Sequence, residues 1–153
     1  MASDPSNRAA GSVPMRDRLS VVNERTAIRS TGQRVIAAAE QAAYSDASCF
    51  AIRLAVEEAL ANAFRHGHRD LDPCTPVSVE YEVERRSIRV SVEDQGPGFS
   101  PEDVPDPTAP ENITKTSGRG LLLVRSYMTE VRHNDRGNRI EMRYDKPAEA
   151  DSA

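Results

Sequence analysis

Leu54-Ala-Val-Glu-Glu-Ala-Leu-Ala-Asn-Ala-Phe-Arg-His-Gly67 is the stretch that decides the fold. Its apolar side chains, with one just before it, recur at the spacing of a helix face packed on a core: Ile52, Val56, Ala59, Leu60, Ala63 and Phe64. Arg65 and His66 place positive charge near the C-terminal dipole, and Gly67 suits a left-handed turn after a helix. The stretch therefore predicts a buried helix that ends at Gly67.

One polar pair interrupts this apolar helix. Glu58 and Asn62 are four residues apart, so both side chains project from the same side of the helix, one turn apart. A carboxylate stacked over a carboxamide is suited to activating water and holding Mg²⁺. Such a pair also arises by chance on ordinary helices, so it gains weight only from motifs elsewhere in the chain. The adjacent Glu57 points elsewhere and is interpreted as part of a solvated face.

The composition indicates one soluble domain without affinity for nucleic acid. The chain has 153 residues, of which 29% are charged and 38% hydrophobic, and this length allows a sizeable core. Aromatic residues make up 5%, tryptophan is absent and the net charge is -4, which argues against base stacking and phosphate neutralisation. No run approaches the ~20 apolar residues of a membrane helix, and the N-terminus lacks the apolar region of a signal peptide. We expect a cytoplasmic protein with no membrane partner and no direct nucleic-acid partner.

Neither the cysteines nor the histidines indicate a metal site. Cys49 and Cys74 lack metal-binding spacing, and we expect reduced thiols, although a single disulfide between them stays open. The pair His66-x-His68 has no matching ligands nearby, so it is interpreted as a polar helix end rather than as a metal site.

Periodicity along the chain predicts the order of the elements. In sequence they are a strand at 18–28, a helix at 31–43, a helix capped by Ser45 or Asp46, strands at 77–83 and 88–94, a proline-rich lid at 99–117, a helix opened by Gly118, and strands at 131–134 and 139–144. Residues 1–14 and 146–153 are expected to be disordered tails around a domain of residues 15–145. The pattern predicts an α+β fold, a two-layer sandwich with helices on one face of a mostly antiparallel mixed sheet.

The first glycine motif is Asp94-Gln-Gly-Pro-Gly98, which follows a predicted strand. Gly96 and Gly98 leave room for a ligand near the backbone. A buried carboxylate accepts hydrogen bonds and cannot donate them, so Asp94 suits the exocyclic amine of adenine, whereas guanine would present a carbonyl oxygen. A hydrogen bond to a charged group contributes ~1.5–3 kcal/mol, so the discrimination is large. In isolation the motif is also compatible with a plain turn.

The second glycine motif, Ser117-Gly-Arg-Gly-Leu121, opens a predicted helix. The free amides and positive dipole end of such a helix favour phosphate binding. Thr114, Lys115 and Thr116 stand just before it and offer further phosphate donors. A Gly-x-Gly before a helix is also typical of a tight loop, and Lys115 alone is compatible with a solvated side chain.

Together, these motifs resemble the GHKL ATP-binding superfamily, which contains gyrase, the large heat-shock chaperone, histidine kinases and MutL. Glu-x-x-x-Asn on a helix, Asp-x-Gly-x-Gly after a strand, a lid, and Gly-x-Gly-Leu opening a helix occur in that order, over about residues 16–144. The chain is most similar to the anti-sigma factor serine/threonine kinases, because we expect no phosphoacceptor-histidine hairpin and no gyrase-like or MutL-like extension. The resemblance implies the Bergerat, or histidine-kinase-like ATPase, fold.

The resemblance implies a role for each matching residue. Glu58 would be the base that activates the attacking hydroxyl, Asn62 would ligate Mg²⁺, and Asp94 would read adenine. The implied ATP-binding residues are Asn62, Arg65, His66, Asp94, Gly96, Gly98, Lys115, Thr116, Ser117, Gly118, Arg119, Gly120 and Leu121. Arg119 and Thr116 depart from the family pattern, which often has an apolar residue at the first position and in some relatives a basic one at the second, so their phosphate contacts stay open.

The function that the resemblance implies is an ATP- and Mg²⁺-dependent serine/threonine protein kinase. Its substrate would be an anti-anti-sigma factor of the STAS type, and it would regulate a sigma factor by sequestration. The family usually forms homodimers, for which the first strand near Arg18–Asn23 offers an edge. Two alternatives stay open: a non-catalytic ATP-gated switch that binds a partner, and a detached histidine-kinase-type catalytic domain.

Overall fold

The computed structural model describes residues 15–97 and 124–147 of the chain. The elements of these residues are β1 (Arg16–Val21), α2 (Arg25–Gln41), α3 (Asp46–Asn62), the π-helical turn η1 (Ala63–Gly67), β2 (Val77–Val83), β3 (Ser87–Glu93), β4 (Glu130–His133) and β5 (Arg139–Asp145). Residues 124–127 are also helical.

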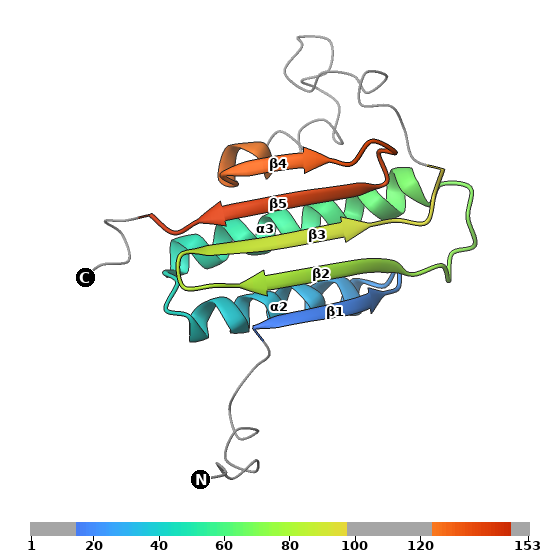
Figure 1. The fold of residues 1–153 in the computed structure, drawn as a ribbon. Coiled ribbons are helices and arrows are strands. Elements are labelled where there is room, and N and C mark those ends of the chain that lie inside the picture. Colours follow the sequence, from blue (N-terminus) through green and yellow to red (C-terminus); the bar gives the residue numbers. More distant parts are fainter. Residues whose placement is uncertain (1–14, 98–123, 148–153) are drawn as a thin grey trace, which may run out of the picture.

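The strands form one five-stranded sheet in the order β1-β2-β3-β5-β4. Every strand pairing within the described residues is antiparallel. Helices α2 and α3 lie side by side against one face of this sheet, and none of the labelled helices in Figure 1 covers the other face. The predicted α+β fold with helices on one face is therefore confirmed.

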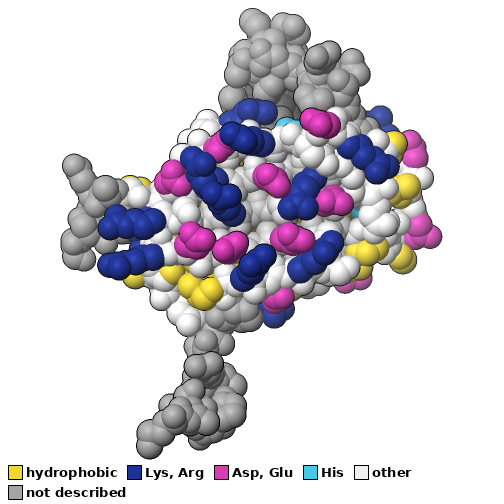
Figure 2. Space-filling model, viewed as in Figure 1, with side chains coloured by type: hydrophobic (Ala, Val, Ile, Leu, Met, Phe, Trp, Pro, Cys, Tyr) yellow, Lys and Arg dark blue, Asp and Glu magenta, His cyan; other side chains and the backbone are white. Residues whose placement is uncertain are grey.

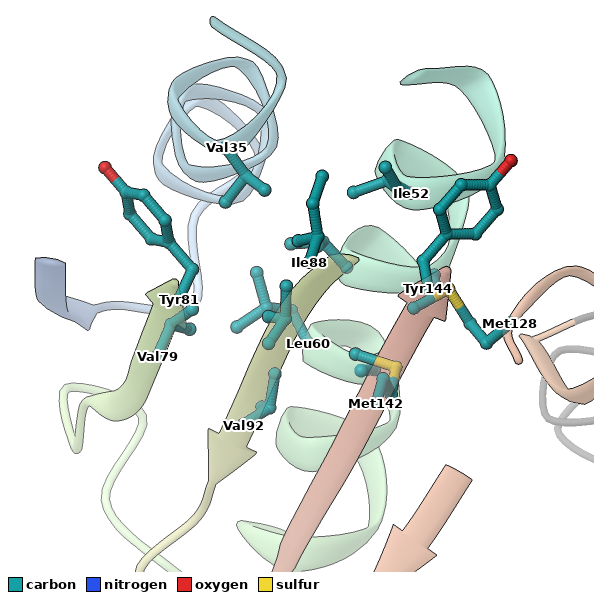
Figure 3. Packing of buried hydrophobic residues seen from close by; sticks show 14 of the residues in the cluster. Val35, Ile52, Leu60, Val79, Tyr81, Ile88, Val92, Met128, Met142 and Tyr144 are labelled. Atoms are coloured by element: carbon teal, nitrogen blue, oxygen red, sulfur yellow. The ribbon is translucent and has the colours of Figure 1, made fainter. Parts of the chain in front are cut away.

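The core lies between the helices and the sheet, and strict alternation in the strands builds it. On β2 every second residue is buried: Val77, Val79, Tyr81 and Val83. Figure 3 shows Val35 of α2 and both Ile52 and Leu60 of α3 pointing toward the side chains of β2, β3 and β5. All three are fully buried, and burying a side chain of this size stabilises the fold by roughly 1.5–3 kcal/mol.

The opposite face of the sheet is covered with interleaved charges (Figure 2). Arg139 is the centre of this pattern, because its guanidinium lies 3.7 Å from Glu80, 3.3 Å from Glu93 and 3.2 Å from Glu141. Each exposed ion pair of this kind contributes little to the free energy of unfolding. The charges therefore suit a sheet face in contact with water and add little to its stability. A shallow hollow in this face is lined by these charges, but it lies across the sheet from α3 and so from the predicted catalytic pair.

Two predicted boundaries near the N-terminus are wrong. The first strand ends at Val21 instead of residue 28, and α2 begins at Arg25, six residues before the predicted start of the helix. The alternation that indicates a strand stops at Val21, and the first turns of α2 contain mostly polar residues that give no helical period. The predicted lid, the start of the helix at Gly118 and both tails up to residue 14 and from residue 148 lie outside the described residues.

Two expectations about the whole chain are also answered for the described residues. Cys49 is buried, Cys74 is exposed, and both are free thiols, so no disulfide joins them. None of the helices in the described ranges has the length and apolar character needed to cross a membrane.

Candidate nucleotide site

The start of α3 is fixed by a side-chain cap, which sets where its polar pair lies. Ser45 Oγ accepts a hydrogen bond of 3.1 Å from the backbone N–H of Ser48, and Asp46 in the first turn suits the positive end of the helix dipole. Three turns later, Glu58 and Asn62 are half-buried, while Ala59 and Leu60 between them are buried. The pair therefore lies at the rim of the core, near the C-terminal end of α3.

The helix ends in a π-helical turn rather than at a left-handed glycine. The backbone N–H of His68 donates to the carbonyl of Ala63 over 3.0 Å, a five-residue span that widens the helix. Gly67 does not have a positive φ, so its predicted left-handed turn is wrong. Glycine is needed at this position for a different reason: a Cβ on Gly67 would collide with the carboxylate of Asp94. Single π-turns inside helices are frequent at functional sites.

Asp94, at the end of β3, meets this turn. Its Oδ1 accepts a hydrogen bond of 2.8 Å from the backbone N–H of Gly96. A Cβ on Gly96 would in turn collide with the carbonyl oxygen of Gly67. Gly67, Asp94 and Gly96 therefore touch one another, and the α3–η1 end and the β3 end form one site.

The backbone of Asp94 is held by a residue that the sequence motifs did not indicate. The N–H of Asp94 donates to the carbonyl of Asn138 over 2.8 Å, and Asn138 Nδ2 donates to the carbonyl of Asp94 over 3.2 Å. Asn138 is buried and closes the turn between β4 and β5, where Gly137 has a φ of 77°. The pairing of Glu93 with Arg139 places Asn138 opposite Asp94. Asn138 could therefore have been identified from the register of the sheet.

His68 connects the π-helical turn to the segment after Asp94. Its Nε2 accepts a hydrogen bond of 2.9 Å from the backbone N–H of Gln95. The imidazole is buried and lies edge-on to the ring of Phe64, at 5.6 Å between centroids. Both histidines lie at the end of the helix, as the sequence indicated, but His66 is exposed and His68 is buried.

The electrostatics of the site follow from partial burial. Burial raises the pKa of the Asp94 carboxyl, while the hydrogen bond from the Gly96 N–H opposes the rise. Burial also lowers the pKa of His66, and the positive charges of Arg65 and Arg69 lower it further. A half-buried carboxylate with one free acceptor oxygen favours a ligand that brings an N–H donor.

Six of the residues that the sequence indicated lie within the described residues. Glu58, Asn62, Arg65 and His66 lie along the end of α3 and η1, and Asp94 and Gly96 lie at the end of β3 beside Gly67. The remaining candidates fall outside the described residues: Gly98, Lys115, Thr116, Ser117, Gly118, Arg119, Gly120 and Leu121.

Asn62 offers an oxygen ligand of the kind that a magnesium–nucleotide complex uses. Across residues 15–97 and 124–147, no group of three or more His, Cys, Asp or Glu side chains is arranged to hold a metal ion. Mg²⁺ prefers oxygen ligands and is usually held by one or two protein groups together with substrate phosphates and water. The carboxamide oxygen of Asn62 is such a group.

Comparisons with known proteins point to one family. A family model described as the histidine kinase-like ATPase domain matches residues 21–144. Serine-protein kinase RsbW of Staphylococcus aureus strain RF122/ET3-1 is 29% identical over 85 residues, which are 52% of this chain and 54% of that protein, and the same protein of strain MRSA252 matches equally. The chain thus spans about half the length of the curated relatives it matches.

One solved structure shares the fold. The histidine kinase domain of the Erythrobacter litoralis EL346 blue-light activated histidine kinase has a TM-score of 0.50 at 22% identity, with 93% of this chain and 72% of that chain covered. At this identity the likeness concerns the arrangement of helices and strands alone.

Proposed function

Because the chain belongs to the histidine kinase-like ATPase family, within the GHKL superfamily, we propose that it is an ATP- and Mg²⁺-dependent serine/threonine protein kinase. Its substrate is an anti-anti-sigma factor of the STAS type, and it regulates a sigma factor by sequestration. The similarity to serine-protein kinase RsbW supports the anti-sigma kinase class. The observation that carries the proposal is the contact of Gly67 with Asp94, which joins the helix of Glu58 and Asn62 to the base-reading carboxylate.

In this proposal each residue has a positional task. Asp94 accepts a hydrogen bond from the exocyclic amine of adenine with the oxygen that Gly96 leaves free. Asn62 offers its carboxamide oxygen to Mg²⁺. The hydroxyl oxygen of the substrate serine bonds to the γ-phosphorus of ATP, and the bond from that phosphorus to the oxygen bridging to the β-phosphate breaks. Glu58 takes the proton that the serine hydroxyl loses. ATP supplies the phosphoryl group and Mg²⁺ neutralises its charge, so the protein mainly positions the reacting groups.

A phosphotransfer assay tests the catalytic part. The protein is incubated with γ-labelled ATP, Mg²⁺ and a STAS-type anti-anti-sigma factor, and we expect label on that partner. Glu58→Gln should lower the rate roughly 10²–10⁴-fold, because a positioned base contributes about that much. Glu57→Gln is the matched control, since Glu57 lies one residue away and pairs with Arg53 at 3.3 Å. Equal rates for the two variants would contradict the role of Glu58.

The chemical nature of the product separates the remaining possibilities. A phosphoserine or phosphothreonine survives acid, whereas phosphohistidine does not. Acid-labile label would indicate a histidine-kinase-type domain, and ATP binding without any transfer would indicate an ATP-gated switch.

The proposed homodimer uses the edge of the sheet. Among the described strands, β1 pairs with β2 alone and lies at one end of the sheet order, so its outer edge is open to a second copy. Light scattering at assay concentration should give the mass of a dimer, and a monomeric mass would contradict this assembly.

A further inference from the structure

His68 is a buried polar residue at the site that the proposed mechanism does not use. Its relative exposure is 8%, which is low for a histidine at the end of a helix, where its neighbours Arg65, His66 and Arg69 are exposed. Its ring packs against Phe64, so the imidazole is fixed in orientation as well as in position. A buried, oriented imidazole requires a partner for its polar atoms.

The partner is the backbone of the adenine-reading segment. The N–H of Gln95 donates to Nε2 over 2.9 Å across a sequence separation of 27 residues, so Nε2 carries no proton and the neutral ring holds its proton on Nδ1. Within the described residues Nδ1 has no hydrogen-bond partner. The whole polar connection of the ring is therefore its bond to Gln95.

This bond is made at the one peptide where it affects Asp94 directly. The N–H of Gln95 belongs to the peptide between Asp94 and Gln95, and the next N–H along the chain, that of Gly96, is the donor that holds Asp94 Oδ1 at 2.8 Å. The Gln95 side chain is held separately, through a bond of 2.9 Å to the carbonyl of Pro76. Loss of the His68 bond would release the N–H of the peptide that follows Asp94, while the carbonyl of that peptide stays held by Asn138 Nδ2 at 3.2 Å and the side-chain contact of Gln95 stays in place.

We propose that His68 is a positioning residue for base recognition: its unprotonated Nε2 holds the Gln95 peptide so that the Asp94 carboxylate faces adenine. The inference rests on the proposed nucleotide-binding function and adds a determinant of base specificity to it. A residue that only fills space would need the shape of the ring and not the acceptor, and this difference can be tested.

Two substitutions separate the acceptor from the ring. In His68→Gln the Oε1 atom reaches about as far as Nε2 and accepts, whereas in His68→Asn the acceptor is too short. We expect His68→Asn to weaken ATP binding roughly three- to tenfold, the effect of one hydrogen bond, and to lower the ATP:GTP affinity ratio by the same factor. His68→Gln should stay within about twofold of the wild type. His133→Asn, at the chain's remaining histidine outside the site, is the matched control.

Nuclear magnetic resonance of the free protein tests the hydrogen bond itself. The ¹⁵N shifts of His68 should show the Nδ1–H tautomer, and the Gln95 amide should exchange slowly in the wild type and in His68→Gln but rapidly in His68→Asn. A general packing defect would not single out the Gln95 amide.

The outcomes are distinguishable. Equal losses in both variants, an unchanged ATP:GTP ratio in His68→Asn, or a proton on Nε2 would each overturn the positioning role. If the wild type binds no ATP, the proposed function fails, and the tautomer and amide exchange still decide whether His68 holds Gln95.

Discussion

In the proposed site the ionised carboxylate of Asp94 is a stronger acceptor for the adenine amine than its neutral form, whereas burial favours the neutral form. Its pKa is raised by burial. We therefore expect ATP affinity to fall as the pH is lowered through that raised pKa, by about tenfold per pH unit below it. Calorimetric titration of ATP across the acidic range measures this. This fall in ATP affinity at acidic pH should be missing in Asp94→Asn. An ATP affinity of the wild type that does not change with pH would contradict the prediction.

The raised pKa of Asp94 also affects the stability of the protein without ligand. The sign of this effect is opposite to that for a carboxylate in an ion pair. A folded-state pKa above the usual 3.8 means that the folded protein binds more protons than the unfolded chain between the two values. The contribution of Asp94 to stability is therefore lost as the pH rises through this window. Asp94→Asn should remove that loss without unfolding the protein, because the carboxamide oxygen still accepts from Gly96.

The glycines at the site are required by space rather than by backbone conformation. A Cβ at Gly96 would collide with the backbone carbonyl of Gly67, which cannot move aside as a side chain does. We expect Gly96→Ala to lower the free energy of unfolding by roughly 1–3 kcal/mol and to abolish ATP binding. Urea denaturation and ATP titration measure the two effects.

Gly32 provides the matched control for that substitution. It lies inside α2, and a Cβ there would meet side-chain atoms no closer than 3.4 Å, the carboxylate of Glu57. Alanine in a helix interior is more favourable than glycine by roughly 0.5–1 kcal/mol. Gly32→Ala should therefore stabilise the protein and leave ATP binding intact. The opposite result, in which Gly32→Ala destabilises the protein and Gly96→Ala is tolerated, would contradict the close contact between Gly96 and the carbonyl of Gly67.

At the scale of elements, the N-terminal cap fixes the residue at which α3 begins, and therefore the positions of Glu58 and Asn62 along the helix. Ser45 Oγ accepts a hydrogen bond from the Ser48 N–H, so Ser45→Ala should lower the free energy of unfolding by about 0.5–2 kcal/mol. Ser30, an exposed residue inside α2, is the control: Ser30→Ala should be neutral or slightly stabilising. Chemical denaturation compares the two, and equal effects would argue against the cap.

Elements with a clear period were predictable from the sequence. The strand Val77–Val83 was placed correctly because apolar and polar residues alternate along its whole length. The start of α2 was missed because its first turn is polar, and the π-helical turn at Ala63–Gly67 was missed because no local pattern distinguishes it from the end of an α-helix.

The site was predictable only as far as its motifs are local. The motifs indicated Asp94 and Gly96, but the tasks of Gly67, His68 and Asn138 come from contacts between distant segments. Asn138, for example, meets Asp94 across 44 residues. Such contacts depend on the register of the sheet and on the angle at which α3 ends, and neither is written in a short stretch of sequence.

For the whole molecule, the two faces of the sheet have separate tasks. The apolar face holds α2 and α3 and so fixes where the polar pair of α3 stands relative to the end of β3 (Figure 1). The other face carries the interleaved charges of Figure 2, with Arg139 among Glu80, Glu93 and Glu141. The central claim is that this arrangement builds one adenine-nucleotide site.

Isothermal titration calorimetry with Mg²⁺ tests that claim most directly, using ATP and GTP on the wild type and on Asp94→Asn. We expect ATP to bind the wild type with one site per chain, GTP to bind at least tenfold more weakly, and Asp94→Asn to lose at least tenfold in ATP affinity, because a hydrogen bond to a charged group contributes ~1.5–3 kcal/mol. Absence of ATP binding, equal affinity for ATP and GTP, or unchanged ATP binding by Asp94→Asn would contradict it.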